Sequence, residues 1–261
     1  MREPLASARA APGGACDHRM LILNLGCGTR TSNHPDVLNV DWSLNIRLKK
    51  SRLLRLVMSP LLDARRRSRL DQMSGRMLAH DLAKGIPFPD DSVDIVYHSH
   101  VLEHLDRPIA RQFLREILRV LKPGGTLRIV VPDFEFLCRA YVSDINRCAR
   151  EPPAIATHED FIAEVLEQSV RREAAGARGR TGLSRLVEQL ALGDARRRGE
   201  THQWMYDRIS LPYILTATGF HGVVVESWNS SRIPGWNEIG LDRNEHGGEY
   251  TRDSLYVEGR K

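Results

Sequence analysis

Three histidines and an acid stand close together in the segment His98-Ser-His-Val-Leu-Glu-His104, which follows a short apolar run. An imidazole exchanges its proton near neutral pH, so His98 and His100 are candidate general bases that could activate a hydroxyl group. His100 and His104 are four residues apart and would lie on one face of a helix. Packing and capping at the start of that helix is the alternative role for this pair.

A glycine loop is the second group suited to chemistry. The apolar run Leu21-Ile-Leu-Asn-Leu25 breaks into Gly26-Cys-Gly28. Two glycines one residue apart, directly after a strand, let the backbone turn sharply and leave room for a ligand against the main chain. Such a loop is typical of a parallel α/β sheet that holds a nucleotide-like cofactor at the carboxyl ends of its strands. By itself it does not separate a methyl donor from a hydride carrier.

Two acids follow the next predicted strands. Asp41 ends the run Val37-Leu-Asn-Val40, and Asp81 comes shortly after Arg76-Met-Leu-Ala79. A carboxylate in the position of Asp41 can accept hydrogen bonds from both hydroxyls of a ribose. A capping or turn aspartate is the alternative.

The elements that must position these residues alternate between strand and helix. Apolar runs predict strands at 21–25, 37–40, 76–79, 92–97, 126–131, 223–228 and 254–258, and helices at 108–121 and up to Thr218. A short helical turn capped by Thr31, Ser32 or Asn33 could follow the first strand. The last two strands have no helix between them, so we expect them to pair antiparallel.

Composition limits the class of protein. The chain has 261 residues, of which 41% are hydrophobic and 27% charged, as in a globular chain with a core. No apolar run approaches the roughly 20 residues that a membrane span needs. Residues 1–19 lack the apolar stretch of a signal peptide and are expected to form a disordered leader. Four cysteines without metal-like spacing favour free thiols and a cytoplasmic location.

Basic residues are concentrated in one insertion, at 46–75, where we expect two helices broken by Pro60. The net charge is +5, and the insertion and its flank contribute Arg47, Lys49, Lys50, Arg52, Arg55, Arg65, Arg66, Arg67, Arg69 and Arg76. Either they form a solvated helix face or they bind an anionic partner.

Six segments, in order between residues 21 and 131, together resemble the class I S-adenosylmethionine-dependent methyltransferases of the type 11 group. They are Leu23-Asn-Leu-Gly-Cys-Gly28, Asn39-Val-Asp41, His80-Asp-Leu82, Ile86-Pro-Phe-Pro-Asp-Asp-Ser-Val-Asp94, His100-Val-Leu-Glu-His104 and Leu118-Arg-Val-Leu-Lys-Pro-Gly-Gly125. A nicotinamide-binding fold is disfavoured, because Gly28 is followed by Thr29-Arg-Thr31 and the third glycine of that motif is missing.

The resemblance implies a Rossmann-like α/β fold with a seven-stranded mixed sheet of order 3-2-1-4-5-7-6, the last strand antiparallel, and a helical insertion between strands 5 and 6. It implies S-adenosylmethionine as the cofactor. The implied cofactor-binding residues are Asn24, Gly26, Cys27, Gly28, Asp41, Trp42, His80, Asp81, Leu82, His98, Ser99 and His104. His98, His100 and His104 could instead bind a metal ion, but the motif explains them without one, so we predict no metal.

The C-terminal part carries a second, more specific resemblance. Thr201-His-Gln-Trp-Met-Tyr-Asp207, Ser231-Arg-Ile-Pro234, Gly240-Leu-Asp242 and Ser254-Leu-Tyr-Val-Glu258 look like a bacterial subgroup that accompanies polysaccharide and glycoconjugate assembly. Aromatic faces and imidazole tips suit a sugar ring, with packing under a lid as the alternative. The candidate catalytic residues are therefore His98, His100, His202 and Tyr206.

The predicted organisation is a leader at 1–19, a cofactor-binding core at 20–133, a helical lid at 134–199 and the rest of the core at 200–261. The predicted function is methyl transfer, at oxygen, to a small-molecule or saccharide acceptor. Two alternatives stay open: an RNA methyltransferase that uses the basic insertion, and a non-catalytic module that only binds S-adenosylmethionine. The sequence leaves the oligomeric state open.

Overall fold

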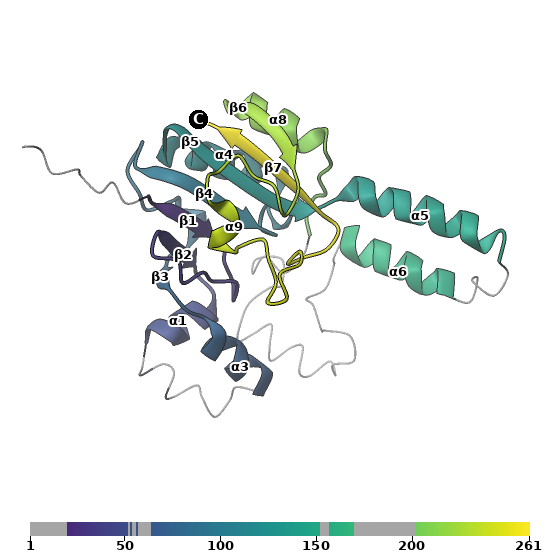
Figure 1. Ribbon diagram of the computed structural model, residues 1–261, viewed down its shortest axis with the longest axis horizontal. Helices are drawn as coiled ribbons and strands as arrows, with labels where there is room; N and C mark the ends of the chain where they lie inside the picture. Colours follow the sequence, from purple (N-terminus) through teal and green to yellow (C-terminus); the bar gives the residue numbers. More distant parts are fainter. Residues whose placement is uncertain (1–19, 52, 54–55, 57–63, 152–156, 170–201) are drawn as a thin grey trace, which may run out of the picture.

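The computed structural model describes residues 20–51, 53, 56, 64–151, 157–169 and 202–261 (Figure 1). The predicted leader, Pro60 and the last part of the predicted lid lie outside the described residues. Within them, no helix is long and apolar enough to cross a bilayer.

Seven strands form one mixed sheet of order β3-β2-β1-β4-β5-β7-β6. β7 pairs antiparallel with both β5 and β6, and the other neighbours are parallel, so the predicted topology is confirmed. The strands are β1 (Ile22–Leu25), β2 (Val37–Asp41), β3 (Arg76–Ala79), β4 (Val93–Ser99), β5 (Leu121–Pro132), β6 (His221–Glu226) and β7 (Ser254–Arg260).

One face of the sheet is covered by α4 (Arg107–Val120) and α8 (Ser210–Thr218). α4 buries Ala110, Phe113, Leu114 and Ile117, the spacing of an apolar helix stripe. The opposite face packs against a C-terminal segment that contains the short helix α9 (Trp236–Ile239). Both faces of the central strands are therefore buried, as in other parallel sheets.

The basic insertion is described in part, as α1 (Leu44–Lys50) and α3 (Ala64–Gln72). Buried residues of these helices, Ile46, Leu48 and Leu70, pack together with Cys27 of the glycine loop. Lys49 Nζ donates to the backbone oxygen of Leu70 at 2.9 Å, which ties one helix to the other. Two helices were predicted here, and both lie against the start of the cofactor loop.

α5 (Phe134–Cys148) and α6 (His158–Ser169) run side by side and project from the carboxyl end of β5 (Figure 1). Asp133 caps α5, since its Oδ1 accepts from the backbone nitrogen of Glu135 at 3.0 Å. Asp144 of α5 accepts from His158 Nδ1 at 2.6 Å and so joins the two helices. They form the first part of the predicted lid.

Several local predictions are wrong. The strand predicted at 223–228 is β6 (His221–Glu226), and the short helix α9 lies before β7 where no helix was expected. No helix follows the first strand, because residues 26–36 form turns and loop only. Arg30 of this loop instead donates to the backbone oxygens of Gly240 (2.6 Å) and Arg243, and its guanidinium lies 4.1 Å from the centre of the Tyr250 ring. The fourth strand also runs to Ser99, two residues beyond the predicted end.

A buried arginine fastens the C-terminal segment to the sheet. Arg128 of β5 has no exposed surface, and it donates to Asp242 at 2.8 Å and to Glu258 at 2.6 Å. Asp242 also accepts from the hydroxyl of Tyr97 at 2.9 Å. These bonds cross the sheet face and fix the segment that holds Arg30.

Candidate functional site

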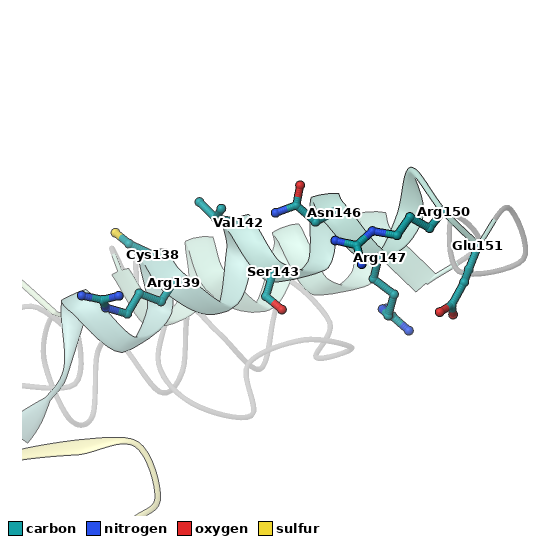
Figure 2. Close-up of a pocket in the computed structure, with 8 residues that line it drawn as sticks. All are labelled: Cys138, Arg139, Val142, Ser143, Asn146, Arg147, Arg150 and Glu151. Carbon is teal, nitrogen blue, oxygen red and sulfur yellow. The ribbon is translucent and has the colours of Figure 1, made fainter.

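Two hollows are candidates for a ligand site. One, of about 710 Å³, lies along α5, and Figure 2 shows that its eight lining residues come from that helix and the three residues after it. The other, of about 190 Å³, is lined by Asn24, Cys27, Thr29, Arg30, Tyr97, Ser99, His100, Tyr250 and Thr251. The smaller cavity lies where β1 and β4 are neighbours and the strand order reverses, which is the usual ligand position in such sheets. This smaller cavity is therefore the candidate cofactor site.

The glycine loop adopts the backbone conformation that its glycines allow. Gly26 and Gly28 have φ of 63° and 54°, the left-handed region that other residues rarely adopt. A Cβ on Gly26 would lie 2.6 Å from Val101 Cγ2, so a side chain has no room there. A Cβ on Gly28 would meet nothing within 4 Å, which leaves its main chain open to a ligand.

Asp41 holds this loop in place. Its Oδ2 accepts from the backbone nitrogen of Gly28 at 2.7 Å, and its Oδ1 accepts from the backbone nitrogen of Ser43. Each carboxylate oxygen has a further lone pair, so the contacts leave capacity for ribose hydroxyls. The next residue, Trp42, is half exposed, with the Arg47 guanidinium 5.0 Å from the ring centre.

The residues after β3 lie beside Asp41. The backbone nitrogen of His80 donates to the backbone oxygen of Asp41 at 3.1 Å. Asp81 caps the 3₁₀ helix η2 (Leu82–Lys84), because its Oδ1 accepts from the backbone nitrogen of Ala83 at 3.1 Å. Leu82 packs against the core. Two acids thus stand at neighbouring strand ends, a spacing that suits the ribose and base of one nucleoside.

Asn24 and Cys27 act within the loop itself. Asn24 Nδ2 donates to the backbone oxygen of Arg30 at 2.9 Å and to Asn39 Oδ1 at 3.0 Å. The thiol of Cys27 is buried, and burial followed by the charge of Asp41 raises its pKa well above the ordinary value. Both side chains line the cavity and shape the loop.

His98 is not brought to the cavity. It lies inside β4 with no exposed surface, and its ring centre is 5.5 Å from that of Phe113 in α4. Neither ring nitrogen has a hydrogen-bond partner in the described part of the chain. Burial lowers the pKa of His98 to about 4, so the imidazole is neutral at pH 7.

His100 does line the cavity, together with Ser99. Its φ of 53° turns the chain out of the strand and directs the ring toward two polar neighbours. Its Nδ1 lies 3.2 Å from Glu103 Oε1, and its Nε2 lies 3.2 Å from the hydroxyl oxygen of Ser254. An imidazole with a carboxylate behind it is the arrangement of a general base.

Glu103 is the site residue that the sequence interpretation missed. Its side chain has no exposed surface. Burial acts to raise its pKa, but the imidazoles of His100 and His104 outweigh burial, so the pKa of Glu103 lies below the ordinary value. The signal was present in the sequence, since this acid stands between two of the histidines that were singled out.

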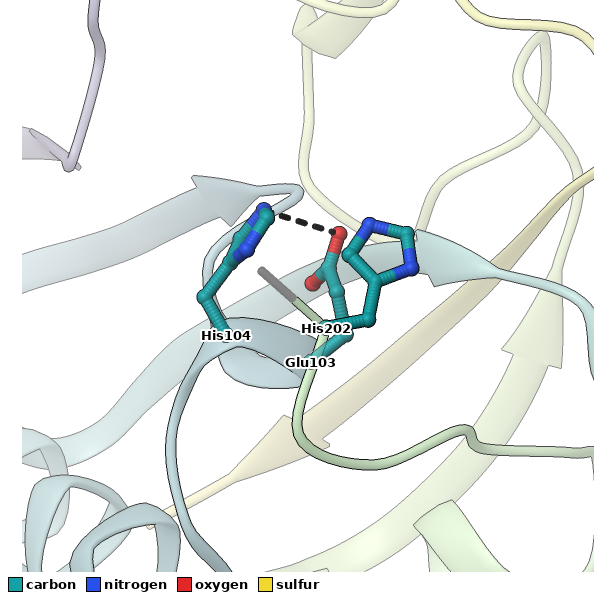
Figure 3. A group of neighbouring side chains, drawn as sticks. All are labelled: Glu103, His104 and His202. Carbon is teal, nitrogen blue, oxygen red and sulfur yellow. Dashed lines mark ion pairs between the residues drawn. The ribbon is translucent and has the colours of Figure 1, made fainter. Parts of the chain in front are cut away.

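His202 and Tyr206, the candidates from the C-terminal part, lie near the segment that contains Glu103 and His104. Figure 3 shows Glu103 between the rings of His104 and His202, whose centres are 4.9 Å apart. The backbone nitrogens of Gln203 and Trp204 both donate to the backbone carbonyl oxygen of Glu103, at 2.7 and 3.2 Å. Main-chain hydrogen bonds therefore hold His202, which is 9% exposed, against the short helix η3 (Leu102–His104).

Tyr206 and Trp204 differ in their surroundings. The Tyr206 side chain is buried, and burial followed by the charge of Glu103 raises its pKa to about 12. Trp204 is 41% exposed, and the Arg107 guanidinium lies 4.4 Å from its ring centre. Trp204 thus presents an aromatic surface to solvent close to the buried cluster.

The central segment of the chain is similar to known methyltransferases. Residues 23–129 match the family model described as a methyltransferase domain. A demethylmenaquinone methyltransferase of Paenarthrobacter aurescens is 34% identical over 148 residues, which are 52% of this chain and 48% of that protein. An uncharacterized methyltransferase of Mycobacterium tuberculosis is 58% identical over 40 residues, 15% of each protein. The match thus spans about half the length of the Paenarthrobacter protein and 15% of the Mycobacterium protein.

Among solved structures, a SAM-dependent methyltransferase from Methanosarcina mazei is 16% identical, covers 92% of this chain and 91% of its own, and has a TM-score of 0.43. The fold follows from the strand order β3-β2-β1-β4-β5-β7-β6. That order and the matched domain support a class I S-adenosylmethionine-dependent methyltransferase domain, with S-adenosylmethionine as its cofactor.

Proposed function

We propose that this chain transfers a methyl group from S-adenosylmethionine to a hydroxyl of a small-molecule or saccharide acceptor, with His100 as the general base. One observation carries the proposal. His100 lines the same cavity as the glycine-loop residues, and its Nδ1 lies 3.2 Å from the buried carboxylate of Glu103. The proposed base and the proposed cofactor loop therefore face one space.

The residues present fit the cofactor. Gly28 leaves its main chain open, and Asp41 and Asp81 stand at adjacent strand ends for the ribose and the adenine. When bound, S-adenosylmethionine supplies a sulfonium methyl group; the acceptor oxygen forms a bond to its carbon, and sulfur keeps the electron pair of the broken carbon–sulfur bond. The chain has to align the acceptor along this line and keep water out.

His100 has the neighbours that a proton acceptor needs. The negative charge of Glu103 beside Nδ1 would stabilise the positively charged ring after the acceptor proton arrives. Nε2 points to the Ser254 hydroxyl, 3.2 Å away, which marks a position that an acceptor hydroxyl could take. Proton transfer of this kind contributes about 10²–10⁴-fold to a rate.

Trp204 and His202 support a saccharide as the acceptor. An exposed aromatic face beside an imidazole suits the C–H faces and hydroxyls of a sugar ring. The resemblance of residues 200–261 to a subgroup that accompanies polysaccharide assembly points the same way. A phenolic or other small hydroxyl compound fits the same chemistry.

Binding and turnover test this proposal separately. Calorimetric titration with S-adenosylhomocysteine should show one site in the wild type and in His100→Gln. Methyl-labelled S-adenosylmethionine, incubated with a panel of saccharides and phenols, should label an acceptor with the wild type and not with His100→Gln. The matched control is His246→Ala, whose side chain is 86% exposed and outside the site. A protein that binds NADH but not S-adenosylhomocysteine would overturn the proposal.

RNA is the second candidate acceptor, because Arg47, Lys50, Arg67 and Arg69 are exposed on α1 and α3 next to the glycine loop. Binding to RNA through them would weaken steeply as salt rises. Strong salt-dependent binding that is lost in Arg67→Ala/Arg69→Ala, with labelled RNA as product, would favour this function. Cofactor binding with no labelled product in any class would favour a non-catalytic module.

A further inference from the structure

Glu103 is a buried carboxylate whose negative charge has few compensating contacts. Glu103 has no exposed surface, and neither oxygen accepts a hydrogen bond of good geometry from a described residue. Its ion pairs among the described residues are with imidazoles only, His100 at 3.2 Å and His104 at 3.8 Å. Removing a carboxylate from water costs several kcal/mol unless charge or hydrogen bonds compensate.

The surrounding ligand atoms form a compact group. A carboxylate oxygen of Glu103 and one imidazole nitrogen each of His104 and His202 all lie within 4.8 Å of one another (Figure 3). A tetrahedral ion with bonds of about 2.1 Å needs its ligand atoms about 3.4 Å apart. Small side-chain rotations close that difference, because the main chain of both segments is already joined at Glu103.

We propose that Glu103, His104 and His202 bind one divalent transition-metal ion of the zinc class. Two imidazoles and one carboxylate are a common ligand set for such ions, whereas Mg²⁺ and Ca²⁺ prefer oxygen ligands. Three protein ligands leave a coordination position open, as catalytic sites do. The metal-free prediction from the sequence weighed His98, His100 and His104, and it did not include Glu103 and His202.

A second group in the fold has similar composition but a different state. Asp144, Cys148 and His158 also lie within 4.8 Å of one another, between α5 and α6. There the carboxylate already accepts from His158 Nδ1 at 2.6 Å and from the Arg147 guanidinium. Arg147 supplies the compensating positive charge in that group. The group is therefore accounted for by ion pairs, and His158→Ala serves as the control for the proposed metal site.

The position of the proposed ion gives it a role in the reaction, and this part rests on the proposed function. His100 touches both places, since it lines the cavity and its Nδ1 lies 3.2 Å from Glu103 Oε1. An acceptor hydroxyl on the open position would lose its proton more easily, to His100, before its oxygen bonds the methyl carbon. The ion would thus select acceptors whose hydroxyl can reach it.

Metal titration of the full chain tests the site without any methyl transfer. Protein stripped with a chelator is titrated with Co²⁺, which reports a tetrahedral site by visible absorption, and with Zn²⁺ by calorimetry. We expect one equivalent to bind the wild type, His158→Ala and His246→Ala. Glu103→Gln and His202→Ala should bind at least about 100-fold more weakly, because each removes a ligand.

Three results would overturn the site: no binding to the wild type, unchanged affinity in His202→Ala, or loss of binding in His158→Ala alone. Circular dichroism and thermal melting identify a variant that has not folded, and His202→Ala then replaces Glu103→Gln, because its side chain is nearer the surface. S-Adenosylhomocysteine binding is measured in parallel. If the protein binds the metal ion but not S-adenosylhomocysteine, the proposed function is refuted while the proposed metal site is supported.

Discussion

Replacing His98 by phenylalanine should reduce the loss of folding stability that the protein shows as the pH falls below 6.5. The imidazole is buried beside Phe113, and its pKa falls from 6.5 to about 4 on folding. Between pH 6.5 and pH 4, His98 is therefore protonated in the unfolded chain and neutral in the folded chain. Stability is lost as pH falls from 6.5 toward 4, and above pH 6.5 this residue contributes no pH dependence.

The magnitude follows from the width of that window. pH 5 lies about 1.5 units below the unfolded-state pKa of 6.5, so protonation of the unfolded chain lowers the free energy of unfolding by about 2 kcal/mol. Urea unfolding of the wild type and of His98→Phe, each at pH 7 and pH 5, gives the loss of unfolding free energy between the two pH values for each protein. This loss should be larger for the wild type by about 2 kcal/mol. The contributions of carboxylates cancel, because they titrate in both proteins.

Two results would refute the reasoning. Equal pH dependence in the wild type and the variant would mean that water or a partner reaches the His98 ring. A large loss of S-adenosylhomocysteine affinity in His98→Phe would return His98 to the cofactor site, as the sequence interpretation proposed. We expect the affinity to be unchanged, since the cavity is lined by Ser99 and His100 and not by His98.

Three further substitutions test other parts of the structure. Asp41→Ala should weaken S-adenosylhomocysteine binding by about 1–3 kcal/mol in calorimetry, and unchanged affinity would remove the ribose assignment. Gly26→Ala should lower the melting temperature and the cofactor affinity together, because φ is 63° and the new Cβ would meet Val101 at 2.6 Å; normal values for both would show that the loop is free to move. Arg128→Leu should cost about 3–5 kcal/mol in urea unfolding, since it leaves Asp242 and Glu258 buried without their partner, and a loss under 1 kcal/mol would mean that water replaces it.

The sheet was predictable because its signal is local. Short buried strands leave apolar runs, and the last two strands pair antiparallel as predicted, although the short helix α9 lies between them in sequence where no helix was expected. Asp41 and Asp81 were placed at adjacent strand ends by the same logic. Each of these inferences needs only a few neighbouring residues and the geometry of parallel strands.

The site was less predictable because its contacts join distant parts of the chain. Gln203 docks on Glu103, and Arg30 binds carbonyls near Gly240, through main-chain atoms that leave no residue pattern. The same bonds to Arg30 hold the loop that was expected to start a helix. His98 was assigned to the site from the resemblance and from its expected place after the strand, whereas β4 runs to Ser99 and the His98 ring is buried beside Phe113.

The place of β7 in the sheet has a consequence for how the chain folds. Residues 254–260 come after every other strand in sequence, yet they lie between β5 and β6. Until they arrive, residues 126–132 present an apolar strand with one unpaired edge, and β6 has no neighbour in the sheet. Unpaired apolar edges recruit other chains, and pairings of high sequence separation form slowly. Refolding should therefore have a concentration-dependent yield, with the glycine loop organised only after β7 has closed the sheet.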